Sequence, residues 1–222
     1  MTVTSSRLLR VPPFERGVTL GDCLVPLRID DRVSTRVHNV ALVLVGILVI
    51  AASAQVAIPI PGTPVPITGQ TFGVLATATA LGFRRGVASV GLYVILGFAL
   101  PIYAGGVSGL DRIGSIEGGQ LVFGATGGYL LGFVLAGAVV GGLAELGWDR
   151  RFAGALAAMA LGSLAIYVVG LPWLALSASL TPEQTLAKGL VPFLLGDAIK
   201  FALAAAAFPV GWWIVGRRPS DR

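Results

Sequence analysis

Two charged residues, Asp197 and Lys200, stand inside a long apolar segment near the end of the chain. They are the only ionisable residues between Lys188 and Arg217. Residues three apart lie on one face of a helix, so the two side chains can meet. A carboxylate accepts hydrogen bonds and an ammonium donates them. Together they would suit a neutral ligand group that carries both donors and acceptors.

The apolar surroundings make this pair costly, because a charged group at membrane depth costs about 2.5–3.5 kcal/mol. The pair is therefore expected to have a use, and two uses other than ligand binding stay open. One is a structural ion pair that neutralises itself and pins two helices. The other is a proton relay in an ion-coupled carrier. Glu145 is the one other acid that such a relay could reach.

Composition places the whole chain in a membrane. Of its 222 residues 55% are hydrophobic and 12% are charged, and the mean hydropathy is +0.85. A soluble domain has about 25% charged residues. Long unbroken apolar runs favour spanning helices over a β-barrel. The 31 glycines suit close helix packing in lipid. The predicted fold class is an all-α integral membrane protein in the lipid bilayer.

The chain lacks the residues that several functional classes require. The chain has one cysteine, Cys23, and one histidine, His38, so it offers neither a disulfide within the chain nor a His/Cys metal site. No catalytic dyad and no P-loop stand in the sequence. The net charge of +5 comes from arginines at the ends of apolar segments, which does not suggest nucleic acid. We therefore expect no enzyme, no metal and no cofactor.

Six apolar segments are each expected to form a spanning helix. They cover residues 37–57, 69–83, 86–100, 126–146, 152–176 and 191–215. The second and third are near the shortest length that crosses a hydrocarbon core about 30 Å thick. Residues 1–36 are predicted to be a poorly ordered cytoplasmic tail, 37–216 the membrane domain and 217–222 the cytoplasmic C-terminus.

The distribution of basic residues predicts the orientation. Six spans put both termini on one side, and the segments on that side hold thirteen of the sixteen lysines and arginines. The segments on the other side hold only Arg112 and Lys188. The positive-inside rule makes the richer side cytoplasmic. The glycine-rich loop 101–125 and the loops 58–68 and 177–189 then lie outside, and a pocket floored by the charged pair opens outward.

The outer ends of the spans supply further candidate binding residues. Glycines allow close backbone approach to a ligand, although turns and helix starts explain several of them equally well. Tyr167 is a pocket candidate, whereas Trp173 fits an interfacial aromatic belt better. The remaining candidates are Gly105, Gly106, Thr126, Gly127, Gly128 and Tyr129. Four prolines between residues 59 and 66 forbid a helix there, so this loop is expected to be extended and to cover the ligand.

Five motifs together resemble one known family. They are Pro64-Val-Pro-Ile-Thr-Gly-Gln70, Leu81-Gly-Phe-Arg-Arg-Gly86, Ala104-Gly-Gly106, Thr126-Gly-Gly-Tyr-Leu-Leu-Gly-Phe133 and Pro192-Phe-Leu-Leu-Gly-Asp-Ala-Ile-Lys200. In this order, over residues 38–210, they look like the biotin-specific S components (BioY family) of energy-coupling-factor transporters.

The resemblance implies a function and a set of partners. It implies a high-affinity biotin-capturing subunit in the bacterial plasma membrane that works with a transmembrane coupling subunit and two ABC ATPase subunits. The family's ring-binding residues fall on Asp197 and Lys200, and Gln70 in the first motif joins the expected site. An S component for thiamin or riboflavin, or a stand-alone ion-coupled carrier, remains an alternative. Homo-oligomerisation stays open.

The sequence departs from the family pattern at two places, and its N-terminal tail is long. Many S components carry an Ala-x-x-x-Ala stripe on the first helix that docks on the coupling subunit, but here Ala41 is followed by Val45. Ser53 and Ala57 offer a small pair further along. Phe123-Gly-Ala125 stands where many members have Gly-Pro, and the tail of 36 residues is longer than the family core needs.

Overall fold

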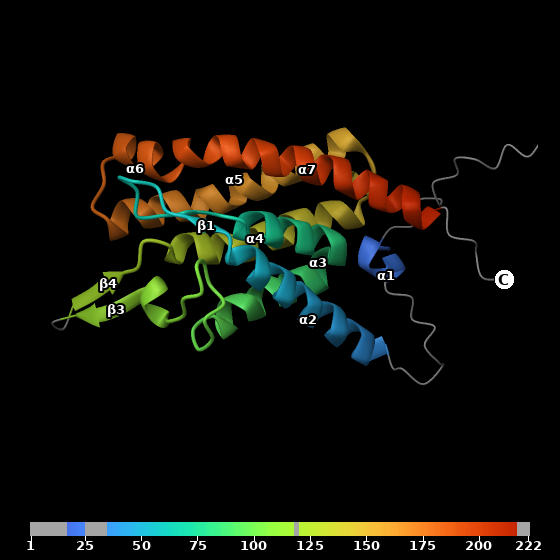
Figure 1. Ribbon diagram of the computed structural model, residues 1–222, viewed down its shortest axis with the longest axis horizontal. Coiled ribbons are helices and arrows are strands. Elements are labelled where there is room, and N and C mark those ends of the chain that lie inside the picture. Colours follow the sequence, from blue (N-terminus) through green and yellow to red (C-terminus); the bar gives the residue numbers. More distant parts are fainter. Residues whose placement is uncertain (1–16, 25–34, 118–119, 217–222) are drawn as a thin grey trace, which may run out of the picture.

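The computed structural model describes residues 17–24, 35–117 and 120–216, and helices dominate it (Figure 1). The α-helices are α1 (Leu20–Leu24), α2 (Thr35–Ala54), α3 (Gln70–Leu96), α4 (Gly127–Glu145), α5 (Phe152–Ser177), α6 (Pro182–Gly189) and α7 (Val191–Gly216). Two short 3-10 helices are η1 (Leu110–Arg112) and η2 (Trp148–Arg150). The strands are β1 (Ala57–Ile58), β2 (Ile67–Thr68), β3 (Gly114–Glu117) and β4 (Gln120–Phe123).

Five helical segments in the described ranges are long and apolar enough to cross a membrane. They begin with α2, α3, α4 and α5 and end with the segment 182–216, which contains α7. Their positions agree with the apolar segments of the sequence, except that α3 spans both the second and the third. The expectation of an all-α membrane fold is therefore confirmed at the level of helical, membrane-length elements.

Helix α3 folds back on itself at Gly82. The backbone of Gly82 has φ 78° and ψ −175°, which is not helical. A side chain at Gly86 would touch the Cα of Ala78, and Gln70 hydrogen bonds to Tyr93, 23 residues later. In a straight helix those two residues would be about 35 Å apart. The halves 70–81 and 83–96 therefore run antiparallel, about 18 and 21 Å long.

Helix α4 packs between α3 and α5 through its glycines. A Cβ at Gly132 would lie 2.8 Å from the carbonyl oxygen of Ile166 on α5. A Cβ at Gly141 would lie equally close to Gly82 at the bend of α3. This helix has two GxxxG pairs: Gly128 and Gly132 face α5, whereas Gly137 and Gly141 face α3. Small residues at such positions let helices approach closely in lipid.

Helix α1 closes one end of the bundle, where it packs against the bend of α3 and the last turns of α7 (Figure 1). Asp22 forms an ion pair of 2.6 Å with Arg85, and Leu20 is buried. This helix lies within the tail that the sequence predicted to be poorly ordered, and Arg85 supplies a partner for it from the bend. Residues 35 and 36 of the predicted tail begin α2, and its remaining parts, 1–16 and 25–34, lie outside the described residues.

Short hairpins and loops occupy the other end. Strand β1 pairs with β2 in antiparallel register and closes the base of the proline-rich loop 59–66, which is not helical, as predicted. The hairpin β3–β4 projects at this end, opposite α1 (Figure 1). The sequence did not predict it, since its glycines indicated only a loop. Thr181 caps α6, and Pro182 stands in its first turn.

Candidate functional site

A cavity lies at the hairpin end of the bundle, between α3, α4, α5, the start of α7 and the loops above them. Its volume is about 820 Å³, including the part open to solvent. The lining residues are Pro64, Val65, Pro66, Thr68, Gln70, Thr71, Tyr103, Ala104, Val107, Arg112, Thr126, Tyr129, Leu130, Phe133, Ser163, Ile166, Tyr167 and Phe193.

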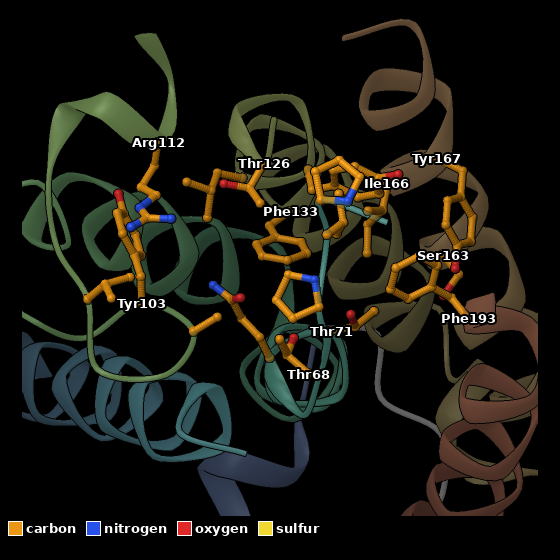
Figure 2. Close-up of a pocket in the computed structure, with 18 residues that line it drawn as sticks. Thr68, Thr71, Tyr103, Arg112, Thr126, Phe133, Ser163, Ile166, Tyr167 and Phe193 are labelled. Atoms are coloured by element: carbon orange, nitrogen blue, oxygen red, sulfur yellow. The ribbon is translucent and has the colours of Figure 1, made fainter. Parts of the chain in front are cut away.

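The two ends of this cavity differ in chemistry. Figure 2 shows Arg112 and Tyr103 on one side and Tyr167, Ser163 and Phe193 on the other. Phe133 lies between them (Figure 2). The cavity therefore has a cation at one end, hydroxyl groups at the other and apolar walls between.

Arg112 brings a permanent charge to the first end. It closes the short helix η1, whose exposed loop position explains why the side chain is only partly covered. Its Nε is buried, donates no hydrogen bond and lies 3.6 Å from an Asp111 carboxylate oxygen. A guanidinium presents a planar fork of donors that matches a carboxylate. This end can therefore bind an anionic ligand group.

The charged pair singled out by the sequence lies just beyond the second end. Asp197 is buried, and its Oδ1 is 3.2 Å from Nζ of Lys200 one turn later on α7. Its Oδ2 accepts a hydrogen bond of 2.6 Å from the Tyr167 hydroxyl on α5. Tyr167 lines the cavity, whereas neither charged residue does. Tyr167 thus lies between the charged pair and the cavity.

A second hydrogen-bond chain fixes Gln70. Its Nε2 donates to the Tyr93 hydroxyl at 2.6 Å, and that hydroxyl donates to the Ile102 carbonyl at 3.0 Å. All three groups belong to segments that the bend of α3 brings together. The chain holds the buried Gln70 amide against the cavity wall, where one polar group of a ligand can meet it.

The proline-rich loop covers one side of the cavity with Pro64, Val65 and Pro66. The Thr63 hydroxyl ties this loop to α6 by a hydrogen bond of 2.8 Å to the Lys188 carbonyl. The Tyr129 hydroxyl donates to the next carbonyl, that of Gly189, at 2.9 Å. The end of α6 is therefore anchored both to the loop and to the cavity wall.

The ten residues expected in the site fall into three groups. Gln70, Thr126, Tyr129 and Tyr167 line the cavity, and Asp197 and Lys200 stand behind Tyr167.

The four expected glycines do not line it. Gly127 and Gly128 pack against Trp173 of α5, where a side chain would clash. Gly105 and Gly106 have φ of 73° and 75° and form a turn beside Ala104.

Sequence reasoning missed Arg112, Ser163 and the two cavity phenylalanines, Phe133 and Phe193. The sequence could have indicated Arg112, because it is one of only two basic residues in the segments assigned to the outside. The indication for Ser163 was weaker: it stands one helical turn before Tyr167 and shares its helix face. The phenylalanines could not be told from other apolar residues of the spans.

Comparison with known proteins gives consistent relatives. The BioY family matches residues 28–217. The Biotin transporter BioY2 of Lactococcus lactis subsp. cremoris is 31% identical over 172 residues, covering 77% of this chain and 87% of the relative. The Biotin transporter BioY of Thermotoga maritima is 38% identical over 150 residues, covering 67% and 81%.

A solved structure has the same fold. It is the crystal structure at 2.1 Å of the S-component for biotin from an ECF-type ABC transporter, with a TM-score of 0.69 and 24% identity. The match covers 80% of this chain and 93% of that one. At this identity the likeness concerns the fold alone. The family match over most of the chain carries the assignment: the protein belongs to the BioY family, a family of transporters and not of enzymes.

Proposed function

We propose that this chain is the biotin-binding S component of an energy-coupling-factor importer, and that it captures biotin with high affinity from outside the cell. The observation that carries the proposal is the cavity with Arg112 at one end and Tyr167, backed by Asp197 and Lys200, at the other. Membership of the BioY family and the names of its relatives support the choice of ligand.

The chemistry of biotin matches the two ends of the cavity. Its ureido group has two N–H donors and one carbonyl, which suit the Asp197 carboxylate and the Lys200 ammonium. Its thiophane ring and the methylene groups of its tail are apolar and suit Phe133, Ile166 and their neighbours. The terminal carboxylate would pair with Arg112, since Arg binds carboxylates in a bidentate manner.

We further propose six membrane crossings with both termini in the cytoplasm. The antiparallel halves of α3 count as two crossings, each shorter than the hydrocarbon core of about 30 Å. The excess of arginines in the tail and at residues 84–85, 150–151 and 217–218 supports the orientation. The end closed by α1 would then face the cytoplasm, and the cavity would open to the exterior of a plasma membrane.

Energy for uptake would come from partners, since no P-loop stands in the sequence. We propose a transmembrane coupling subunit and two ABC ATPases. Helix α2 exposes a broad apolar face that includes Val40, Leu44 and Leu48. Ala41 and Val45 are exposed on the same helix, so docking there would rely on a face without the Ala-x-x-x-Ala stripe.

A proton-coupled carrier is less well supported by the surroundings of Glu145. This residue would be the second acid of a relay, but its Oε1 accepts a hydrogen bond of 2.8 Å from the backbone N–H of Phe83. That bond caps the second half of α3 beside the Gly82 bend. Glu145 therefore has a structural task at the end of the bundle away from the cavity.

Isothermal titration of the purified protein with biotin, thiamin and riboflavin tests the proposal. We expect tight binding of biotin and no binding of the other two vitamins. Failure to bind biotin, or tighter binding of another vitamin, would refute the proposed ligand. Uptake of biotin in a host that lacks the coupling subunits, if abolished by an uncoupler, would show an ion-coupled carrier instead.

A further inference from the structure

The Asp197 carboxylate is engaged on both oxygens. Oδ1 faces Nζ of Lys200 at 3.2 Å, and Oδ2 accepts the Tyr167 hydroxyl at 2.6 Å. The Asp197 side chain is 5% exposed and that of Lys200 is 14% exposed. A buried carboxylate that lost one of these partners would be left with an unsatisfied oxygen, which is costly. The three side chains therefore form a closed polar unit.

The cavity stops at one member of this unit. Tyr167 from α5 and Phe193 from α7 line the cavity, and Asp197 follows Phe193 by one helical turn on the same helix. Figure 2 shows Tyr167 and Phe193 next to each other at this end. The Tyr167 hydroxyl thus occupies the side of Asp197 from which a ligand in the cavity would approach.

We propose that the Tyr167 hydroxyl is a placeholder for the ligand. It donates to Asp197 Oδ2, and when a ligand binds it gives up this position to an N–H donor of the ligand. The inference rests on the proposed function, in which a ureido N–H reaches Asp197. Tyr167 is in this view a positioning residue that keeps the carboxylate hydrogen-bonded and oriented until a ligand binds.

The exchange has a consequence for selectivity. A ligand with an N–H donor replaces one hydrogen bond to Asp197 by another, so the buried carboxylate stays paired throughout. A ligand of the same shape without a donor would have to leave the Asp197–Tyr167 bond intact or leave Asp197 unpaired. Sites built around such a polar group reject analogues that lack the matching donor far more strongly than apolar sites do. Tyr167 would thus favour the binding of ligands that carry an N–H donor over ligands of the same shape that lack one.

The substitution Tyr167→Phe tests the proposal, because the proposal predicts that this variant binds biotin more tightly. Removing the competing hydroxyl should lower the Kd for biotin about tenfold, as expected for one hydrogen bond to a charged group. The association rate should rise as well. In an Asp197→Asn background the gain should shrink, since the two residues act on one bond. A purely structural role of Tyr167 would not tighten binding.

Tyr129→Phe is the matched control. Tyr129 also lines the cavity, and its ring meets that of Tyr167 edge to face at 6.5 Å, but its hydroxyl donates to the Gly189 carbonyl. This variant should not tighten biotin binding. Unchanged or weaker binding by Tyr167→Phe, in protein that keeps its thermal unfolding midpoint, would overturn the placeholder role.

A measurement on the unaltered chain tests the same proposal without requiring that Tyr167→Phe folds. The chain has four tyrosines, and loss of the bond to a carboxylate changes the near-UV absorption of a tyrosine. Biotin should therefore produce a tyrosine difference spectrum that persists in Tyr129→Phe. Biotin binding without any such difference would also overturn the placeholder role, whereas absence of binding in the unaltered protein would refute the proposed function itself.

Discussion

Asp197 combines two properties that rarely meet in one residue of a spanning helix. It carries a charge at a buried position, and it has a cation within 3.2 Å on its own helix. The lysine one turn later lowers the cost of burying the carboxylate, but a buried ion pair by itself adds little stability. The pair is therefore better explained by the cavity beside it than by the stability of α7.

The substitution Asp197→Asn should weaken biotin binding by about 1–3 kcal/mol. An amide accepts hydrogen bonds less strongly than a carboxylate, and charge-assisted bonds are about twice as strong as neutral ones. Isothermal titration of the purified variant measures the loss. Glu183→Gln removes an exposed acid on α6 and serves as the control. An affinity equal to that of the unaltered protein would rule out a role for Asp197 in binding.

Arg112 should discriminate between biotin and its uncharged amide. The substitution Arg112→Gln should raise the Kd for biotin roughly tenfold to a hundredfold, because a charge-assisted pair contributes about 1.5–3 kcal/mol. The Kd for biotinamide should change little, since this ligand has no carboxylate. Titrations of both ligands into both proteins give the comparison. An equal loss for the two ligands would mean that Arg112 shapes the loop and does not contact the carboxylate.

At the scale of elements, α1 stabilises the bend of α3. Arg85 makes two hydrogen bonds to the Asp22 carboxylate, of 2.6 and 2.8 Å, and one of 3.0 Å to the Thr19 hydroxyl. A side chain at Gly82 would clash with Thr19, and one at Gly211 would meet Leu20. A segment of eight residues thus joins the bend of α3 to the last turns of α7.

Loss of this ion pair should loosen the end of the bundle. We expect Asp22→Asn to lower the free energy of unfolding by about 0.5–1 kcal/mol, since the pair is partly exposed and screened. Burial raises the pKa of Asp22, but the bonds from Arg85 and Thr19 outweigh it and lower the pKa. This stabilisation is therefore present at neutral pH and lost as the pH falls through the lowered pKa. Thermal unfolding and the rate of trypsin cleavage before residue 35 measure it.

The proline-rich loop should become less accessible when biotin binds. It lines the cavity and is tied to α6 through Thr63, so a bound ligand adds contacts on its inner side. A cysteine introduced as Pro61→Cys, in a Cys23→Ser background, should react with a maleimide more slowly in the presence of biotin. Glu183→Cys on the exposed face of α6 is the control. Equal rates with and without biotin at position 61 would count against a lid.

At the scale of the whole molecule, Asp149 joins the connection of α4 and α5 to the end of α7. Its Oδ2 accepts a hydrogen bond of 2.6 Å from Nε1 of Trp212, and the Arg150 guanidinium lies 4.1 Å from the same ring. Its Oδ1 is buried and makes no hydrogen bond. Burial raises the pKa of Asp149 to about 6, although the Trp212 bond opposes the shift.

This raised pKa predicts a pH dependence of stability. The folded state holds a proton on Asp149 below about pH 6, whereas an unfolded Asp releases it near 3.9, so the folded state binds more protons between these values. The free energy of unfolding should therefore rise by about 1 kcal/mol as the pH falls from 7 to 5. Thermal unfolding at both pH values measures the slope. Asp149→Asn should remove it, and an identical slope in that variant would refute the assignment.

The sequence alone determined where the membrane-length helices lie and which charged residues are unusual. Apolar runs, and the arginines, glycines and prolines that end them, are local properties of the chain. They therefore predicted the bounds of α2, α4, α5 and α7 within a few residues. The motifs also identified the family, because together they form a specific pattern.

Only the tertiary structure decided how these residues meet. The return of α3 at Gly82 brings Gln70 to Tyr93, and the packing of α5 on α7 puts Tyr167 between the cavity and Asp197. The ordering of α1 likewise depends on Arg85, 63 residues away from Asp22. Contacts of this kind join residues far apart in the chain, and no local pattern of types and spacing encodes them. The expected floor of the pocket, Asp197 and Lys200, thus lies behind a tyrosine.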